Sequence, residues 1–512
     1  MKKKVRLEEI KRLFEAYEEL TVNKLHSYTG IAIRTIRDYL KILIEDNLIV
    51  AIGSTNKRYY KRTYAIDENP IVVDVWQNHI KVGTISFSYA KGYNFSYVSS
   101  YHGKKLPSLP DDINHSYGLF SVFENLIPES TRRERLLLKD DKILNPLELL
   151  LELDNTHGNF DFVAVDTDIS NFIQNRQIPS WKSIKNHILG TNDFVNLLDF
   201  EVDIPQVELQ GNAKSRELYS SLSGYQHKID VNIDFDTHTI KRVDKSKKEL
   251  AHYLLKPYAS DKRIKYTPYL ALNEHLFMSF AKNILKLDVP YSAVILGEHK
   301  DFYFLVKRYD RYKGYKYQQY DFAQYLDIES EEKYDITITS ILKLFATLVK
   351  DKKSKEDVFV FIVYASLIKH GDLHAKNIGL IETTKDKWEL SPLYDIISTY
   401  VYEGKNSDDF GISFDKSNPK KRKLRYKEYL LIANILDISS SRAKLLLKNT
   451  IKRFQIFFPS YIKTTQEFEQ TLGYAPKLSK KLNSLYIEKN IELDKLGILK
   501  EIGLKRENCI TS

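Results

Sequence analysis

The 512-residue chain is longer than a single hydrophobic core usually organises, which predicts two or three domains. Its 43% hydrophobic and 29% charged residues exclude global disorder and fibrous repeats. A formal net charge of +10 favours a polyanionic partner. The single cysteine, Cys509, excludes a disulfide framework and a thiolate zinc site. Because the sequence shows neither a signal peptide nor an apolar run long enough to span a membrane, we expect a cytoplasmic protein.

The first 62 residues carry fourteen Lys or Arg against eight Asp or Glu, so six of the ten surplus positive charges lie there. The spacing of apolar residues predicts a first helix, and Thr21 is placed to cap a second helix over 22–27. A third helix is expected over 31–46, followed by a hairpin of 48–52 and 59–64. The apolar positions that define the first and third helices are Ile10, Leu13, Tyr17, Leu20, Ile33, Ile36, Leu40, Leu43 and Ile44.

This order of elements is that of a winged helix-turn-helix, which we expect to bind DNA. The third helix would enter the major groove, and the wing would meet phosphates. The expected DNA contacts are Arg34, Thr35, Arg37 and Lys41 on the helix and Lys57, Arg58, Lys61 and Arg62 on the wing. The alternative is an amphipathic helix pair with a solvated basic face that serves in dimerisation or protein docking.

The most informative stretch of the chain is 369–378, KHGDLHAKNI, which follows an apolar run and precedes a second acid, Asp395. A D-x-x-x-x-N loop with a further Asp about twenty residues on suits phosphoryl transfer from ATP. Asp372 would be the catalytic base, with Asn377 and Asp395 as ligands of Mg²⁺ or Mn²⁺. Taken alone, such a loop also occurs by chance. Its flanks resemble the catalytic loop of aminoglycoside and choline phosphotransferases, so the loop leaves the substrate open.

Other motifs resemble signatures of the HipA family of serine/threonine kinases, the toxins of HipBA-type toxin–antitoxin systems, and they occur in that family's order. They are 118–130 (GLFSVFENLIPES), 221–228 (SLSGYQHK), 253–257 (YLLKP), 273–274 (NE) and 306–311 (VKRYDR). Because a helix-turn-helix precedes them, the chain is most similar to the subgroup with a fused DNA-binding domain, the YjjJ/HipH-like proteins.

The resemblance implies a set of ATP-binding residues, with Lys256 at the phosphates and the backbone of 307–309 at adenine. That set is Ser223, Gly224, Tyr225, Gln226, His227, Lys228, Lys256, Lys307, Arg308, Tyr309, Asp310, His374, Ala375, Lys376, Asn377, Tyr394 and Asp395. It also implies ATP and Mg²⁺ as cofactors and autophosphorylation on Ser221 and/or Ser223, which would switch the kinase off. The implied partners are a protein substrate, by analogy an aminoacyl-tRNA synthetase, as well as DNA, an antitoxin and a second copy of the chain.

Several of these residues have simpler interpretations. Lys256 could be a surface lysine, and Glu274 could interact with a helix dipole instead of pairing with Lys256. His374 could pack within the loop, and Ser221 lies in a serine cluster typical of turns. The chain also departs from the family pattern, since His370 stands where many relatives carry Asn.

We therefore expect an α+β protein in four parts. These are a winged helix-turn-helix over 1–66, a HipA-like N-terminal subdomain with an unrecognised insertion over 70–215, a kinase N-lobe-like part over 216–345 and a helical kinase C-lobe over 346–512. The predicted function is an ATP- and Mg²⁺-dependent serine/threonine kinase of HipA type that acts as a growth-inhibiting toxin and regulates its own operon. The alternatives are a nucleotide-sensing transcription regulator with an inactive kinase fold and a small-molecule phosphotransferase.

Overall fold

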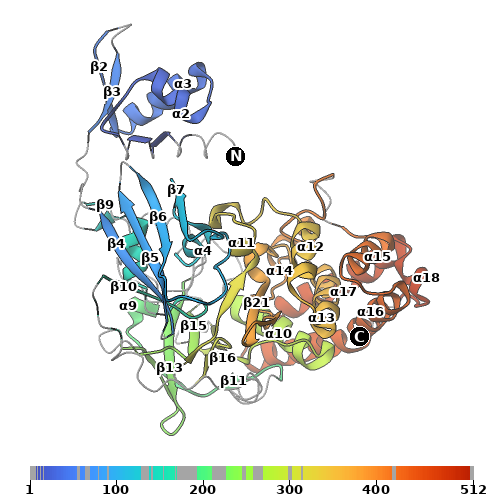
Figure 1. Cartoon of the computed structure of the whole chain (residues 1–512). Coiled ribbons are helices and arrows are strands. Elements are labelled where there is room, and N and C mark those ends of the chain that lie inside the picture. The colour runs from blue at the N-terminus through green and yellow to red at the C-terminus, as the bar shows by residue number, and fades with distance from the viewer. Residues whose placement is uncertain are drawn as a thin grey trace.

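The computed structural model describes most of the chain. The described residues are 7, 10–11, 13–14, 17–54, 58–63, 70–78, 80–88, 91–127, 138–139, 142–143, 145–153, 155–165, 167, 169, 193–209, 227–244, 249–257, 269–297, 302–312, 315–417 and 423–507. They form a small N-terminal unit, a β-rich middle and a helical C-terminal part (Figure 1).

The N-terminal unit packs two helices, α2 (Val22–Thr29) and α3 (Ile33–Glu45), beside a small antiparallel sheet. The sheet has the order β1-β3-β2, formed by Glu19–Leu20, Tyr59–Arg62 and Ile49–Ile52. The predicted cap of α2 is confirmed, since the Thr21 side chain accepts a hydrogen bond from the backbone N–H of Lys24 at 3.3 Å. Gly30 ends this helix in the left-handed conformation, with φ of 64°.

Two apolar positions of this unit differ from the prediction. Leu20 does not continue a helix but lies in β1, where it pairs with Tyr60 of β3. Ile44 was expected on the buried face of α3, yet it is 37% exposed, and Tyr39 is buried in its place. The buried stripe of Ile36, Tyr39, Leu40 and Leu43 follows the helical period, which turns Ile44 outward.

The middle of the molecule begins with a five-stranded antiparallel sheet in the order β10-β4-β5-β6-β7. Its strands are Phe160–Ala164, Ile71–Gln77, Ile80–Ser88, Gly92–Tyr97 and Ile113–Ser116. The short helices α4 (Ser121–Glu124) and α6 (Pro146–Leu151) accompany it, together with the strand pair β8 (Leu138–Lys139) and β9 (Lys142–Ile143).

A seven-stranded sheet follows, in the order β11-β16-β17-β15-β13-β14-β12. Its strands are Leu197–Leu198, Ser292–Leu296, Phe302–Lys307, Tyr253–Pro257, Ile229–Asp234, Thr239–Arg242 and Glu201–Asp203. Helix α9 (Gln206–Leu209) precedes β13, and α10 (Leu270–Phe280) with the π-helical turn η4 (Ala281–Leu285) connects β15 to β16. The expected boundary at 215/216 lies outside the described residues. Strands β11 and β12 precede it and still join this sheet.

Short elements connect the sheet to the helical part. They are β18 (Arg311–Tyr312), β19 (Tyr315–Lys316), β20 (Gln319–Asp321), α11 (Phe322–Tyr325), η5 (Ser330–Glu332), η6 (Ala375–Asn377), β21 (Gly379–Thr384) and β22 (Lys387–Leu390). Strands β20, β21 and β22 form a three-stranded sheet of their own. The candidate catalytic loop, 369–378, therefore leads from a long helix over 352–368 into this small sheet.

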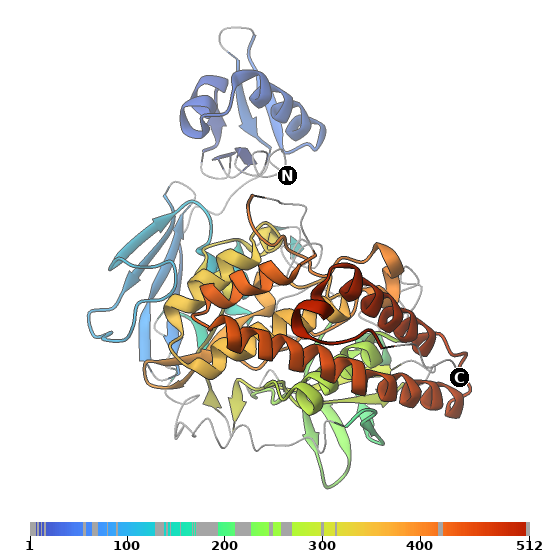
Figure 2. The ribbon, with the colours of Figure 1, turned by 90° about the vertical axis from the view of Figure 1, so that its right-hand side faces the viewer.

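The C-terminal part is helical, as predicted for the last stretch of the chain (Figure 2). Its helices are α12 (Ile338–Leu348), α13 (Lys352–Ile368), α14 (Tyr400–Glu403), η7 (Gly404–Asn406), α15 (Tyr426–Ile435), α16 (Ser440–Thr471), α17 (Leu478–Lys495) and α18 (Ile498–Ile502). Helix α12 runs across the expected boundary at 345/346. The domain change expected there therefore falls inside a continuous helix.

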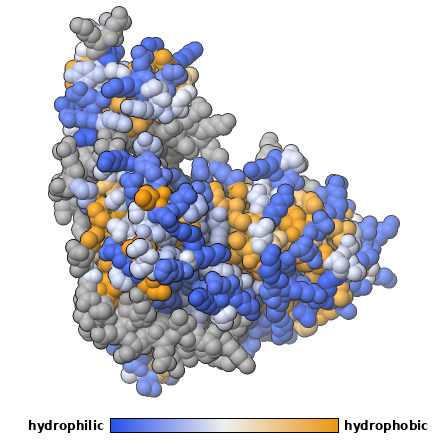
Figure 3. Space-filling view, viewed as in Figure 1, coloured by the Kyte–Doolittle hydropathy of each residue, from blue (hydrophilic) through white to orange (hydrophobic). Residues whose placement is uncertain are grey.

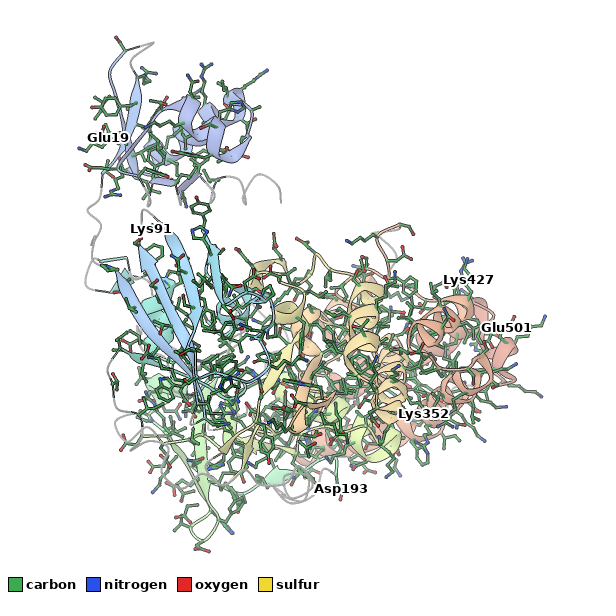
Figure 4. All side chains as sticks on the ribbon, viewed as in Figure 1. Glu19, Lys91, Asp193, Lys352, Lys427 and Glu501 are labelled. Carbon is green, nitrogen blue, oxygen red and sulfur yellow. The ribbon has the colours of Figure 1, made fainter. Side chains whose placement is uncertain are left out.

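The surface of the molecule mixes hydrophilic and hydrophobic residues on the face shown in Figure 3. Charged side chains such as Lys352, Lys427 and Glu501 stand on the outside of the helical part (Figure 4). Among the described residues, no helix is both long enough and apolar enough to cross a membrane.

An aromatic cluster joins α10 to two helices of the C-terminal part, α13 and α16. Phe280 at the end of α10 stacks on Tyr364 of α13, with ring centroids 5.6 Å apart. It also meets Phe454 and Phe458 of α16 edge to face. Since these side chains are fully buried, truncating any of them would leave a cavity that the surrounding helices cannot easily fill.

Phe457 and Phe458 form a matched pair for testing this packing, because the first is 43% exposed and the second is 0% exposed on the same helix. We expect Phe458→Ala to lower the free energy of unfolding by about 3–5 kcal/mol. The Phe457→Ala control should change it by about 0.5 kcal/mol or less. Urea unfolding followed by circular dichroism measures both values, and equal losses for the two variants would contradict this packing.

Candidate active site

A buried ion pair connects the seven-stranded sheet to helix α10. Lys256 lies on β15, and its Nζ donates to both carboxylate oxygens of Glu274 on α10, at 2.8 and 3.0 Å. The two side chains are 3% and 2% exposed. This contact decides between the two interpretations of Glu274, because its carboxylate engages Lys256 from the second turn of α10. It also rules out a surface position for Lys256.

Asp395 completes a three-membered cluster. Its carboxylate also forms an ion pair with Lys256, yet its side chain is 36% exposed. Its backbone has a φ of 52°, a left-handed conformation that is uncommon for residues other than glycine. The cluster thus presents one open carboxylate above a buried lysine.

The ionisation of the cluster follows from burial and from the opposed charges. Burial alone would lower the pKa of Lys256, but the carboxylates of Asp395 and Glu274 outweigh it and raise that pKa above its ordinary value. Burial raises the pKa of Glu274 to about 7, against the opposing effect of Lys256. Burial would also raise the pKa of Asp395, but the positive charges of Lys256 and Lys228 hold it well below its ordinary value.

The candidate catalytic loop is a closed turn after α13. The helix ends at Ile368, and Lys369 caps it in the left-handed conformation. The Asn377 side-chain oxygen accepts the backbone N–H of His374 at 2.9 Å, and the His374 ring accepts the backbone N–H of Lys376 at 3.3 Å. These reciprocal bonds fix the short helix η6, so the His374 ring serves in holding the loop.

Asp372, the expected base, lies half-buried in this loop. The Tyr334 hydroxyl donates to its Oδ1 at 2.5 Å. The Tyr334 ring meets the His374 ring edge to face, with centroids 5.0 Å apart. Behind the loop, a Cβ at Gly411 would come within 2.8 Å of the carbonyl oxygens of both Gly371 and Leu373, so only glycine fits there.

His370 is a buried residue at the start of this loop. It is 0% exposed, and among the described residues neither ring nitrogen has a hydrogen-bond partner. Burial lowers the pKa of His370 to about 4, so the ring is neutral near pH 7. Its backbone forms a bridge with Phe410, next to Gly411. The position at which the chain departs from the HipA pattern is therefore a buried packing position.

Lys376 joins the loop to the N-terminal subdomain. Its Nζ donates to the carbonyl of Asn125 at 3.2 Å and to the Ser330 hydroxyl at 2.8 Å. The Asn125 side chain in turn donates to the carbonyl of Ile328 at 2.8 Å, and the Glu124 carboxylate accepts the backbone N–H of Ser330 at 2.8 Å. The expected ATP contact at Lys376 instead anchors the loop to the 118–130 motif, of which 128–130 lie outside the described residues.

The expected hinge residues have structural partners. The backbone N–H of Lys307 donates to the carbonyl of Tyr291 at 2.8 Å, and the backbone N–H of Arg308 donates to the carbonyl of His252 at 2.9 Å. These two donors are therefore used within the sheet, and an adenine base would need other groups of the 307–310 segment. The Lys307 side chain donates to the carbonyls of His252 and Arg311, both at 3.3 Å.

The side chains of Arg308, Asp310 and Arg311 form a buried network. Arg308 donates to both oxygens of Asp310 at 3.1 and 2.9 Å and to the carbonyls of Asn155 and Thr156 at 2.8 Å. Arg311 donates to Asp310 at 3.0 Å. The network anchors the 155–158 turn against the strand end, which the sequence did not reveal.

This turn contributes His157, whose ring lies 6.1 Å from that of Tyr394. The Tyr309 ring also stacks on the Tyr394 ring, with the two ring centroids 5.9 Å apart. Tyr394 donates its hydroxyl to the carbonyl of Lys376 at 2.5 Å. The structure therefore brings Tyr309 together with Tyr394, the neighbour of Asp395, and adds His157, which lies in none of the sequence motifs.

The phosphate-loop prediction is described only in part. Ser221, Ser223, Gly224, Tyr225 and Gln226 lie outside the described residues. His227 is held by α9, its ring nitrogen lying 2.7 Å from the carbonyl of Glu208. Lys228 is buried, and its charge acts on Asp395, so the end of this loop approaches the cluster.

The candidate DNA-binding residues differ in their availability. Exposed side chains are those of Arg34, Arg37, Lys41 and Arg58, with Thr35 half-buried. Lys61 forms an ion pair with Glu18 at 2.8 Å, and Arg62 donates to the carbonyl of Phe14 at 3.3 Å. Lys57 lies outside the described residues. The helix α3 thus presents more available basic side chains than the described part of the wing.

The oxygen donors fit a metal that arrives with a nucleotide. Asp395 offers an open carboxylate, and Asn377 offers a side-chain oxygen that already accepts one hydrogen bond. Within the described part of the chain, no group of three or more His, Cys, Asp or Glu could hold a metal alone. Mg²⁺ commonly binds through one or two carboxylates together with substrate phosphates and water, which matches this sparse donor set.

A strand lysine paired with a helix glutamate, followed by a D-x-x-x-x-N loop and a further aspartate, is the arrangement of a protein-kinase-like core. Residues 220–456 match the family model of the HipA-like C-terminal domain. That match covers a little under half of the chain and shows a HipA-like C-terminal domain within it.

Two relatives are similar to part of this chain. The protein named "Putative kinase" from Haemophilus influenzae is 30% identical over 195 residues, which cover 36% of this chain and 53% of the relative. "Putative kinase Y4dM" from Sinorhizobium fredii is 28% identical over 198 residues, which cover 36% of this chain and 47% of that protein. The chain therefore spans about half the length of the relatives that it matches.

A solved structure extends the likeness in fold. HipA from the Shewanella oneidensis toxin–antitoxin complex of HipA, HipB and operator DNA aligns over 84% of this chain and 99% of its own, with a TM-score of 0.59 and 15% identity. This likeness shows that the shared fold reaches well beyond residues 220–456.

The buried neutral His370 predicts a pH-dependent stability. Its pKa is about 4 in the folded chain and near 6.5 when exposed, so the unfolded chain takes up the proton first as the pH falls. The contribution of His370 to folding should therefore be complete above pH 6.5 and fall by about 2 kcal/mol at pH 5. In the His370→Leu variant this loss should disappear. Urea unfolding between pH 7.5 and 5 measures the difference, and parallel pH curves for the two proteins would contradict it.

Proposed function

We propose that the chain is an ATP- and Mg²⁺-dependent protein serine/threonine kinase of HipA type. The observation that carries this proposal is the buried Lys256–Glu274 ion pair with Asp395 beside it. In protein kinases the equivalent lysine contacts nucleotide phosphates and is held by the helix glutamate. The names of the two relatives and the HipA-like domain support the same activity.

Each residue of the site has a separate task in this proposal. Lys256 acts as a point charge for the phosphates, and Glu274 keeps its ammonium group in place. Asp372 orients the acceptor hydroxyl and takes its proton. Asp395 and Asn377 would hold Mg²⁺, which would neutralise charge on the phosphates when bound. Tyr309 and His157 lie beside Tyr394, which precedes Asp395 in the chain, and the three rings would flank the nucleotide.

The biological setting is part of the same proposal. The HipA neighbour comes from a complex with HipB and operator DNA, which supports a toxin with an antitoxin partner here. Autophosphorylation on Ser221 or Ser223 would place negative charge close to Lys228 and switch the kinase off. The phosphoryl acceptor in the protein substrate is a seryl or threonyl side chain. By family analogy, an aminoacyl-tRNA synthetase is the substrate to test first.

Phosphoryl transfer tests the catalytic assignment. With γ-labelled ATP and Mg²⁺, the wild type should label itself or a lysate protein, and Asp372→Asn should lower the rate by about 10²–10⁴-fold because the acceptor proton has no base. Asp386→Asn, in the exposed turn between β21 and β22, is the matched control and should keep the wild-type rate. If Asp372→Asn labels as fast as the control, Asp372 is not the base. Labelling of a small alcohol with no labelled protein would instead indicate a small-molecule phosphotransferase.

We further propose that the N-terminal unit is a winged helix-turn-helix that binds DNA. Helix α3 supports this role, because Arg34, Arg37 and Lys41 are exposed on one side while Ile36, Leu40 and the rest of its apolar stripe are buried on the other. The wing contributes Arg58 among its described residues, since Lys61 and Arg62 already have partners in the N-terminal segment.

Fluorescence anisotropy with a duplex from the chain's own promoter region tests this second proposal. Replacing Arg34 and Arg37 together with Ala should weaken binding at least tenfold, because the major-groove contacts of α3 would be lost. Lys352→Ala, an exposed lysine of the helical part, should leave binding unchanged. Equal affinity for all three proteins would contradict a role for α3 in DNA binding.

A further inference from the structure

The hydroxyl of Tyr334 is hydrogen-bonded to Asp372, the general base of the proposed reaction. A general base for phosphoryl transfer must lie within hydrogen-bond distance of the proton that it removes. Tyr334 Oη lies 2.5 Å from Oδ1 of Asp372, with the phenol as donor. Any seryl or threonyl hydroxyl of a protein substrate would have to reach the same carboxylate. The chain therefore holds one of its own hydroxyl groups where an incoming acceptor would sit.

The seat of Tyr334 is built by several elements. The ring meets His374 of the catalytic loop edge to face, and a Cβ at Gly411 would approach ring atom Cε1 to 3.1 Å, so the glycine leaves room for the ring. The neighbouring Lys333 offers its carbonyl to the backbone N–H of Ala375 at 3.3 Å. These contacts tie the turn before α12 to the catalytic loop through two adjacent residues, Lys333 and Tyr334.

The Tyr334 side chain is nonetheless open to solvent on one side. Tyr334 is 40% exposed, although it is a large ring in contact with the loop. An acceptor must be reachable by a nucleotide while its hydroxyl stays on the base. A buried structural tyrosine such as Tyr364, which is 0% exposed and donates to the carbonyl of Phe277, does not meet this condition.

We propose that Tyr334 is an internal phosphoryl acceptor of this chain, modified by its own Asp372-containing site. The proposal rests on the kinase function proposed above. In this step Tyr334 Oη attacks the γ-phosphorus of ATP, and Asp372 takes the phenol proton. The bond between the γ-phosphorus and the β,γ-bridging oxygen breaks, and ADP leaves with the electron pair. The products are phosphotyrosine and ADP, and the proton then passes from Asp372 to water.

The modification would also open the acceptor position. A tyrosine phosphate carries about −1.5 to −2 charges at neutral pH and would face the Asp372 carboxylate. Repulsion between like charges would move the ring away from Asp372. Lys333 offers a positive charge close by, since its Nζ lies 5.3 Å from the Tyr334 ring centroid. An external hydroxyl could then take the vacated position on Asp372.

Phosphopeptide mass spectrometry of the full chain after incubation with ATP and Mg²⁺ tests the proposal. Phosphate is expected on Tyr334 in the wild type and in the control Tyr117→Phe, whose exposed tyrosine follows β7 in the five-stranded sheet. The Tyr334→Phe variant keeps the ring and should lack this phosphate, and Asp372→Asn should lose it at least 100-fold. Because Tyr334 contacts Asp372 of the same chain, the fraction modified per minute should not change on tenfold dilution of the protein.

The outcomes separate this inference from the kinase proposal. Phosphate on other residues or on lysate proteins, with none on Tyr334, overturns the inference and leaves the kinase function standing. The same holds if Tyr334→Phe only accelerates transfer to other acceptors, since the tyrosine would then block the site without accepting phosphate. A rate of Tyr334 modification that falls with dilution also overturns transfer within one chain. If no ADP is released and no protein is labelled, both proposals are overturned.

Discussion

The ammonium group of Lys256 is the constraint on which the site depends. It is buried within the seven-stranded sheet, and a buried charge is strongly unfavourable unless it is paired and hydrogen-bonded. Two carboxylates from distant parts of the chain meet it, Glu274 from α10 and Asp395 from the segment after β22. One lysine therefore fixes the helix, the sheet and the acidic segment relative to one another.

The ionisation of this cluster indicates where a cation would bind. Burial raises the pKa of Glu274 to about 7, whereas the charges of Lys256 and Lys228 hold the pKa of Asp395 well below its ordinary value, so Asp395 is the carboxylate that stays ionised. A metal ion beside Asp395 would bind that carboxylate without displacing Lys256. Asp395 is the member of the cluster with 36% of its side chain exposed, so it is where such an ion can enter.

The catalytic loop depends on packing as much as on polar bonds. The His370 side chain is fully buried, its ring nitrogens have no hydrogen-bond partner among the described residues, and Gly411 lies so close behind the loop that no other residue fits. Lys376 ties it to Asn125 of the N-terminal subdomain. The geometry around Asp372 is thus set by elements that are far apart in the sequence. A change in the 118–127 segment should therefore alter the geometry around Asp372.

What the sequence predicted well is local, or belongs to a motif. The cap at Thr21 and the helices after residue 426 follow from short-range patterns, and the partnership of Lys256 with Glu274 was one of two open interpretations. The sequence could not show that Lys376 turns toward Asn125, that Lys61 pairs with Glu18, or that Leu20 forms a strand. Each of these depends on a contact with a segment whose position only the folded chain defines, and Tyr334 escaped notice for the same reason.

Nucleotide binding to a lysine variant tests the central claim that the Lys256 cluster is the phosphate site. Isothermal titration calorimetry with a non-hydrolysable ATP analogue and Mg²⁺ would compare the wild type with Lys256→Met and with Lys385→Met, an exposed lysine in the turn after β21. Circular dichroism would confirm that each protein is folded. Binding at least tenfold weaker in Lys256→Met, with wild-type affinity in Lys385→Met, is the result that this account predicts. Equal affinity of the folded Lys256→Met protein and the wild type would contradict it.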